Sequence, residues 1–241
     1  MTLLLFQTDS NLREFDAMMT AADTEARTIV LDRTAFYPGG GGQPHDTGTV
    51  RAGERSWPVE KVEKRGDEVV HHLGGDVPLP QAGEIVRGEL DWERRYRLMR
   101  THTAMHVLCG TIWREFGAQV TGGQMYLDRA RMDFELDDLN PERVAQIEAR
   151  ANAAIAGGAP VTVRILPREE AFAIPDLIRT KINLLPEGIA EVRVVSIGDF
   201  DTQADGGTHV ADAREVGGIR IIGTRSKGKI NKRLEIALID D

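Results

Sequence analysis

A change in hydrophobic periodicity near residue 91 constrains the fold of this 241-residue chain more than any other feature. Before it, short runs alternate between apolar and polar side chains and are separated by Gly, Pro and Asp. After it, apolar side chains recur at steps of three and four from Trp92 to Phe116. The first pattern is typical of β-strands and the second of one long helix with an apolar stripe. Two domains are therefore expected, residues 1–90 and 91–241.

The first domain is expected to be a small β-barrel, because turn residues divide it into short strands at the spacing of an all-β fold. In the second, Asn140 is a good N-cap and Pro141 a good first helical residue, so a helix begins there and stops at glycines 157–158. Strands and helices do not alternate strictly, so this domain is α+β, with a long helix and an antiparallel sheet. The predicted strands are 28–31, 47–51, 57–62, 68–72, 84–90, 125–136, 161–166 and 192–197, a short helix covers 169–174, and a hairpin joins 219–224 to 230–239.

The composition is that of a soluble globular protein. Hydrophobic residues make up 41% of the chain and charged residues 28%. Both fractions are near the averages for soluble globular proteins, which argues against a disordered chain and against a membrane span. The apolar run at residues 3–6 is too short for a signal peptide or a membrane helix. The single cysteine, Cys109, forms no internal disulfide and suits a reducing compartment. We expect a cytoplasmic protein, either monomer or homodimer, with no membrane partner.

The net charge of -8 argues against nucleic-acid binding in general, because phosphate contacts come from Lys and Arg. Two segments are nevertheless locally basic, and they remain compatible with RNA binding. Ordinary solvated faces are the competing interpretation. The first segment holds Arg94, Arg95, Arg97 and Arg100, and the second holds Arg225, Lys227, Lys229, Lys232 and Arg233.

His102 and His106 lie four residues apart on the predicted helix, which places both imidazoles on one face, where they can chelate one metal ion. A lone histidine on an apolar stripe is usually a packed core residue. For a pair at this spacing, flanked by Thr101 and Thr103 that could hydrogen-bond to them, metal ligation and core packing are equal alternatives. Thr103 stands where HExxH metalloproteases carry their glutamate, so that class is not supported.

A second polar element, residues 205–209, reads Asp-Gly-Gly-Thr-His. Asp205 and His209 can bend back around the two glycines to face one point, and both are competent zinc ligands. The same residues are also simply a good turn. With the helical pair they supply three histidines and one carboxylate, the ligand count of a hydrolytic zinc site that keeps a position open for water or substrate.

Four consecutive glycines, residues 39–42, follow Phe36, Tyr37 and Pro38. Ordering four glycines costs conformational entropy, so the segment is expected to require unusual dihedral angles or a close backbone approach to a partner. It lacks the Lys and Ser or Thr of a P-loop. A flexible surface loop is the alternative.

Three motifs in this order resemble those of the editing domains of alanyl-tRNA synthetases and of their free-standing AlaX-type relatives of medium length. They are FYPGGGGQP at residues 36–44, HTAMH at 102–106 and DGGTH at 205–209, and the resemblance covers nearly the whole chain. It implies a β-barrel-like N-terminal domain, a zinc-dependent α+β editing domain, and hydrolysis of the ester in seryl- or glycyl-tRNA made with the alanine tRNA.

The resemblance also implies one Zn²⁺ per chain, held by His102, His106 and His209 with Asp205, and these four are the expected catalytic residues. The family pattern has Cys where Asp205 stands, and a carboxylate is a harder ligand that holds zinc less tightly. Three interpretations of Asp205 remain: direct ligation, which we favour; a base or supporting group beside three histidines; and a site that has lost its metal.

Residue type and the resemblance together indicate the substrate contacts. A site that pairs a substrate hydroxyl strongly rejects the analogue lacking it, so Gln43, Thr121 and Thr208 are the expected readers of serine, whereas glycine is admitted for its small size. The further substrate-binding residues are Gln203, Gly206 and Gly207. The tRNA-binding residues are Arg94, Arg97, Lys227 and Lys229.

Two other functions fit the same residues: a metal-dependent hydrolase of another small ester or amide, and a non-catalytic tRNA-binding module that has lost its metal through Asp205. Aminoacylation is not expected, because the sequence shows no ATP-binding motif and is too short to hold a synthetase catalytic domain as well.

Overall fold

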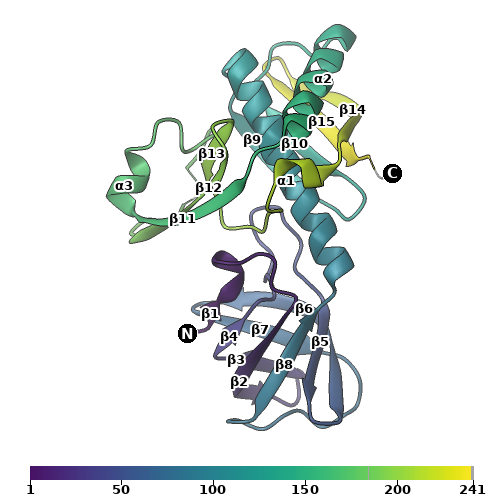
Figure 1. Ribbon diagram of the computed structural model, residues 1–241, viewed down its shortest axis with the longest axis vertical. Coiled ribbons are helices and arrows are strands. Elements are labelled where there is room, and N and C mark those ends of the chain that lie inside the picture. The colour runs from purple at the N-terminus through teal and green to yellow at the C-terminus, as the bar shows by residue number, and fades with distance from the viewer. Residues whose placement is uncertain (184, 240–241) are drawn as a thin grey trace. The chain divides into compact units, whose positions relative to one another are not determined.

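The computed structural model describes residues 1–183 and 185–239, and the chain forms two compact units, Met1–Leu98 and Met99–Asp241 (Figure 1). Helix α1 (Trp92–Phe116) begins in the first unit and continues into the second. The first unit extends beyond the sequence-based boundary at residue 90 because the opening turns of α1 bury Arg95 beside Asp46 of the same unit. None of the described helices is long and apolar enough to cross a membrane.

The first unit is a closed barrel in the order β2-β3-β7-β6-β5-β8, with antiparallel neighbours throughout, which confirms the predicted barrel. Alternating side chains such as Met19, Ile29, Val50 and Trp57 point inward and fill it. Its strands are β2 (Glu14–Asp23), β3 (Thr28–Leu31), β5 (Gly48–Ala52), β6 (Arg55–Arg65), β7 (Glu68–Leu73) and β8 (Ile85–Leu90), while β1 (Leu3–Leu4) pairs with β4 (Arg33–Thr34) outside it and η1 (Leu5–Gln7) is a short 3-10 helix.

Strand β2 was not predicted. It begins with the inward-outward alternation of a half-buried strand, in which Phe15, Ala17 and Met19 are buried. Its Ala, Asp and Glu residues, however, have low β-propensity. Pairing with β8 on one side and β3 on the other stabilises it. Tertiary pairing therefore overrides local preference at this position.

The four-glycine segment is ordered by its backbone. Residues 39–42 all have positive φ, from 56° to 135°, which only glycine adopts readily. Gly40 and Gln43 exchange two backbone hydrogen bonds, and the Tyr37 hydroxyl donates to the Gly40 carbonyl at 3.0 Å. The expectation of unusual dihedral angles is confirmed.

The second unit contains two antiparallel sheets beside α1, as expected for an α+β fold (Figure 1). One has the order β14-β15-β10-β9 and the other β11-β12-β13, and α2 begins at Pro141 with the Asn140 side chain accepting from the Arg143 amide, as predicted. The elements are β9 (Val120–Met125), β10 (Ala130–Phe134), α2 (Pro141–Gly157), β11 (Val161–Pro167), α3 (Arg168–Phe172), β12 (Glu191–Ile197), β13 (Asp201–Ala204), η2 (Ala213–Val216), β14 (Ile219–Gly228) and β15 (Asn231–Leu238).

The prediction of one strand over residues 125–136 is wrong. The chain turns after Met125, where the Tyr126 amide donates to the Arg129 carbonyl, and β10 then returns along β9. Alternation over residues 130–136 hid the turn, because period-two patterning carries no signal of where a strand reverses.

Candidate metal centre

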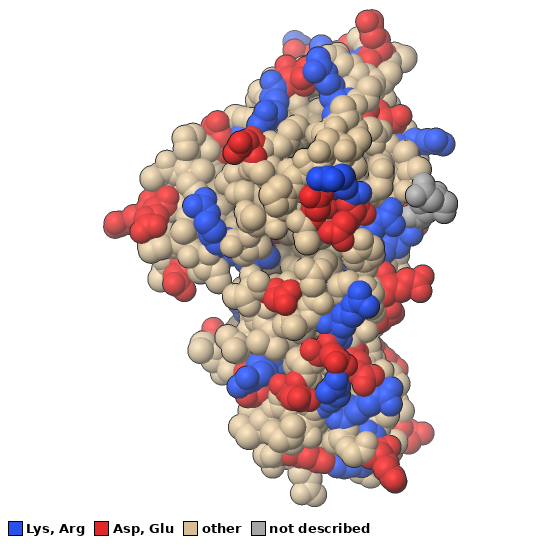
Figure 2. All heavy atoms as spheres, viewed as in Figure 1, with Lys and Arg blue, Asp and Glu red and all other residues tan. Residues whose placement is uncertain are grey.

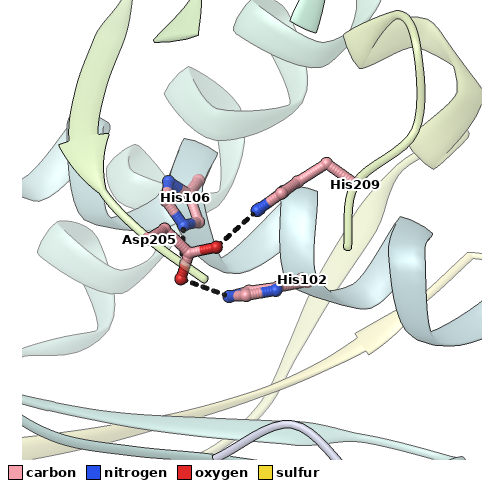
Figure 3. Close-up of side chains that lie close together, drawn as sticks. All are labelled: His102, His106, Asp205 and His209. Carbon is pink, nitrogen blue, oxygen red and sulfur yellow. Dashed lines mark hydrogen bonds and ion pairs between the residues drawn. The ribbon is translucent and has the colours of Figure 1, made fainter. Parts of the chain in front are cut away.

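Three imidazoles and one carboxylate converge in the second unit (Figure 3). His102 and His106 come from α1, whereas Asp205 and His209 come from the segment after β13. Each residue offers one ligand atom, and these four atoms lie within 4.8 Å of one another. The sequence-predicted ligand set is therefore assembled at one point.

Asp205 lies between the three imidazoles. Its carboxylate is 3.0 Å from His209 Nε2, 3.5 Å from His102 Nε2 and 3.9 Å from His106 Nε2. Tetrahedral zinc with bonds of about 2.0–2.2 Å has ligand atoms about 3.3–3.6 Å apart. Small side-chain rotations would bring the four donors to that spacing, and three imidazoles with a carboxylate suit a zinc-like ion. The residues present fit one such metal.

Local structure brings the two halves together. The four-residue helical step places His102 and His106 on one face of α1, with their ring centroids 5.1 Å apart. After β13, the Gly207 amide donates to Asp205 Oδ2 at 2.7 Å and closes a tight turn. This turn returns His209 to the cluster, where its ring stacks on His102 with centroids 4.4 Å apart.

Neighbouring groups hold the candidate ligands in place. Thr103 Oγ1 lies 3.3 Å from His209 Nδ1 and also accepts the Val210 amide, so the far nitrogen of that ring is engaged. Arg193 Nη1 donates to the Asp205 carbonyl at 2.9 Å and lies 3.7 Å from its carboxylate. Such contacts orient metal ligands and determine which nitrogen faces the ion.

For three of the four residues, the electrostatics match the protonation states that ligation requires. Burial lowers the pKa of His102 well below its ordinary value and lowers the pKa of His209 to about 4, in both cases against the attraction of Asp205. Burial would raise the pKa of Asp205, but its interactions with His102, His106 and His209 outweigh burial and hold that pKa well below the usual range. Neutral imidazoles and an ionised carboxylate are the forms that bind metals.

His106 differs from the other two histidines. Burial lowers its pKa, but hydrogen bonds to Asp201 and Asp205 together with their charges outweigh burial and raise the pKa to about 9. The imidazolium is thus the stable form beside two carboxylates. A metal that takes Nε2 would displace this proton and provide the positive charge instead.

The predicted substrate-binding residues lie in different places. Gly207 and Thr208 are buried in the turn between Asp205 and His209, and Gly206 is exposed there. The Gln203 amide donates to the Asp201 carboxylate at 2.7 Å. Thr121 lies on β9 of the same unit, whereas Gln43 is buried in the barrel unit.

The structure changes the interpretation of the first basic segment, because not all of its arginines are exposed. Arg95 is wholly buried with Asp46, so it is wrong to count it among solvated cations. Arg94 donates to the His45 carbonyl, and Arg97 is half-buried.

In the second basic segment, Lys227 and Arg233 both pair with Asp133, whereas Lys229 and Arg225 are exposed. On the face drawn in Figure 2, basic and acidic side chains are interspersed over both units.

Sequence reasoning missed two polar residues of the centre, Arg193 and Asp201. Arg193 is a charge between buried valines of strand β12, and a charge there is rarely kept without a partner. Asp201 is fully buried within a stretch that reads as a polar loop. The first had a usable sequence signal, and the second had none.

Comparison with known proteins identifies the family. The model of class II (A) tRNA synthetases matches residues 8–94, and the model of the threonyl and alanyl tRNA synthetase second additional domain matches residues 192–235. The alanyl-tRNA editing protein AlaX-M of Methanosarcina acetivorans is 40% identical over 100% of both chains. The chain belongs to the AlaX-M family of alanyl-tRNA editing proteins.

Other relatives agree with this assignment and confirm the resemblance inferred from the three motifs. The AlaX-M protein of Saccharolobus solfataricus is 37% identical over 97% of this chain and 98% of its own. Alanine–tRNA ligase of Ignicoccus hospitalis is 39% identical over 93% of this chain, which matches 24% of the ligase. The second matching model includes Asp205 and His209, so it covers half of the candidate metal centre.

Proposed function

We propose that this protein is a trans-editing hydrolase of the cytoplasm that removes serine or glycine from mischarged alanine tRNA and so supports translational fidelity. The observation that carries the proposal is the convergence of His102, His106, Asp205 and His209 within 4.8 Å. The names of the AlaX-M relatives support alanyl-tRNA editing as the setting of this chemistry.

The proposed cofactor is one zinc ion per chain, held by the three histidines and by Asp205 as a direct ligand. When bound, such an ion polarises a carbonyl oxygen or lowers the pKa of water. An aminoacyl ester is already activated, so the protein has mainly to position it. The chain does so with a rigid cluster, because Arg193 and Gly207 fix Asp205 while Thr103 fixes His209.

We propose Thr121 as the residue that recognises the serine hydroxyl. It lies at a bulge in β9, where Asp133 faces Gly122 but Phe134 faces Val120, and bulges re-aim side chains beside active sites. A Cβ on Gly123 would lie 3.3 Å from Met105 Cε of α1, so β9 passes the helix turn that carries His106. Thr121 Oγ1 donates to Asn231 Oδ1 at 3.3 Å, which leaves its lone pairs as acceptors.

The tRNA backbone is proposed to contact exposed cations. Lys229 and Arg225 on the C-terminal hairpin are the stronger candidates, because they are exposed whereas Lys227 is paired with Asp133. Arg94 and Arg97 remain candidates in the first unit. Phosphate contacts of this kind release counterions, so binding should weaken steeply as salt rises.

One experiment tests the proposal directly. Metal content is measured on purified protein, and deacylation of seryl-, glycyl- and alanyl-tRNA is followed before and after stripping by a chelator. We expect hydrolysis of the first two, loss on stripping and recovery with Zn²⁺. His106→Gln should abolish it, whereas His72→Gln, a histidine on the barrel that bonds Glu63, should not. Equal rates in stripped and loaded protein would refute the metal role, and equal turnover of free aminoacyl esters would favour a small-ester hydrolase.

A further inference from the structure

The buried carboxylate of Asp201 lies beside His106, one of the candidate ligands. Asp201 Oδ2 lies 3.3 Å from His106 Nδ1, on the side of the ring opposite the nitrogen that faces Asp205. The Asp201 side chain is fully buried. Burying an ionised carboxylate is costly unless it is paired, so its position beside His106 requires an explanation.

The partners of Asp201 fix its position but do not satisfy it. The Gln203 amide donates to Oδ2 at 2.7 Å, and Arg179 Nη2 approaches Oδ1 at 3.8 Å while its guanidinium stacks on Trp113. Within the described chain, Oδ1 has no hydrogen bond. Asp201 therefore engages His106 and Gln203 through Oδ2 alone.

A helical glycine permits this contact. Gly110 lies four residues after His106 on α1, and a Cβ there would come within 3.2 Å of Asp201 Cβ and 2.8 Å of Phe200 Cε1. The second separation is shorter than real Cβ contacts. Gly110 therefore allows β13 to approach the helix face that carries His106, although glycine in a helix costs about 1 kcal/mol relative to alanine.

An ionised carboxylate can only accept hydrogen bonds, so the nitrogen that faces it must carry the proton. We propose that Asp201 is a positioning residue that holds His106 in its Nδ1–H form, so that the Nε2 lone pair is presented to the metal, and that Gly110 permits that contact. This inference rests on the metal site of the proposed function but not on its tRNA substrate.

The wild-type protein provides the first test, which needs no variant. Long-range ¹H–¹⁵N spectra of the zinc-loaded chain report which nitrogen of each histidine carries a proton. We expect His106 protonated at Nδ1 and metal-bound at Nε2. The opposite tautomer, or no zinc binding at all, would overturn the inference.

Zinc affinity, measured by competition with a chromogenic chelator, provides the second test. Asp201→Ala should weaken zinc binding 10- to 100-fold, as expected for lost outer contacts, and Asp201→Asn should lose less because its amide oxygen still accepts. Asp199→Asn removes the same charge from an exposed position two residues away and should bind zinc like the wild type. Affinity of folded Asp201→Ala within twofold of wild type would overturn the proposal.

Gly110→Ala keeps the test decisive if the Asp201 variants do not fold. This variant changes no polar group and favours the helix, but it should lower zinc affinity because the added methyl group displaces β13. Unchanged zinc affinity together with an unchanged His106 tautomer would contradict the proposed role of Gly110. Zinc-loaded protein with the expected tautomer but no deacylation would refute the proposed function alone. Normal deacylation with unchanged affinity in Asp201→Ala would refute this inference alone.

Discussion

The buried ion pair between Arg95 and Asp46 provides a quantitative test of how α1 is attached to the barrel unit. Both side chains are essentially inaccessible, at 0% and 1% exposure. Arg95 Nε donates to both carboxylate oxygens at 3.0 and 3.1 Å, and its other nitrogens donate to the carbonyls of Ser10 and Ala35. Asp46 also accepts the Tyr37 amide at 2.6 Å, just before the four glycines. The pair therefore fixes both the helix start and the glycine segment.

Arg95→Met removes one charge and leaves the Asp46 carboxylate buried, with the Tyr37 amide still donating to it. Breaking a buried pair in this way costs about 3–5 kcal/mol, which corresponds to a fall in melting temperature on the order of 10 °C. Replacing both partners, with Arg95→Met and Asp46→Leu together, should recover much of the loss because no uncompensated charge remains.

Chemical denaturation followed by circular dichroism measures these free energies of unfolding. Arg51→Met is the matched control, since Arg51 pairs with Glu89 on the same barrel but both are substantially exposed, at 52% and 36%, and such pairs contribute about 0–1 kcal/mol. A loss below 1 kcal/mol in Arg95→Met, equal to that of the control, would refute the reasoning. A double variant less stable than the single one would refute the charge argument specifically.

Three further predictions concern pH, metal and specificity. Burial lowers the pKa of His71 to about 4 in the folded protein. Between pH 4 and 6.5 the unfolded chain therefore binds more protons than the folded one. The free energy of unfolding should fall by about 3 kcal/mol as the pH drops from 6.5 to 4. His71→Gln should flatten this slope in urea titrations; an equally steep slope would exclude His71. Asp205→Cys should raise zinc affinity at least tenfold in chelator competition, because thiolate is the softer ligand; unchanged affinity would indicate that position 205 does not contact the metal. Thr121→Val should lower the ratio of seryl- to alanyl-tRNA deacylation at least tenfold, and an unaltered ratio would remove Thr121 from substrate recognition.

Much of the fold followed from local pattern. Period-two runs predicted β3 and most barrel strands, and the three-and-four spacing predicted α1 with both its histidines on one face. The errors occurred where pairing decided the outcome. Strand β2 has a weak local preference for strand, and the turn between β9 and β10 left no break in the alternation of its flanking residues.

The sequence by itself determined the four candidate ligands, because ligand chemistry and close spacing are local properties: two histidines one helical turn apart, and an aspartate and a histidine around two glycines. Only the tertiary structure determines which residues contact these ligands on the side away from the metal position. Asp201 reaches His106 across a separation of 95 residues, and Gly110 leaves the space for that contact. Such contacts depend on how β13 packs against α1, and no periodicity or motif records that packing.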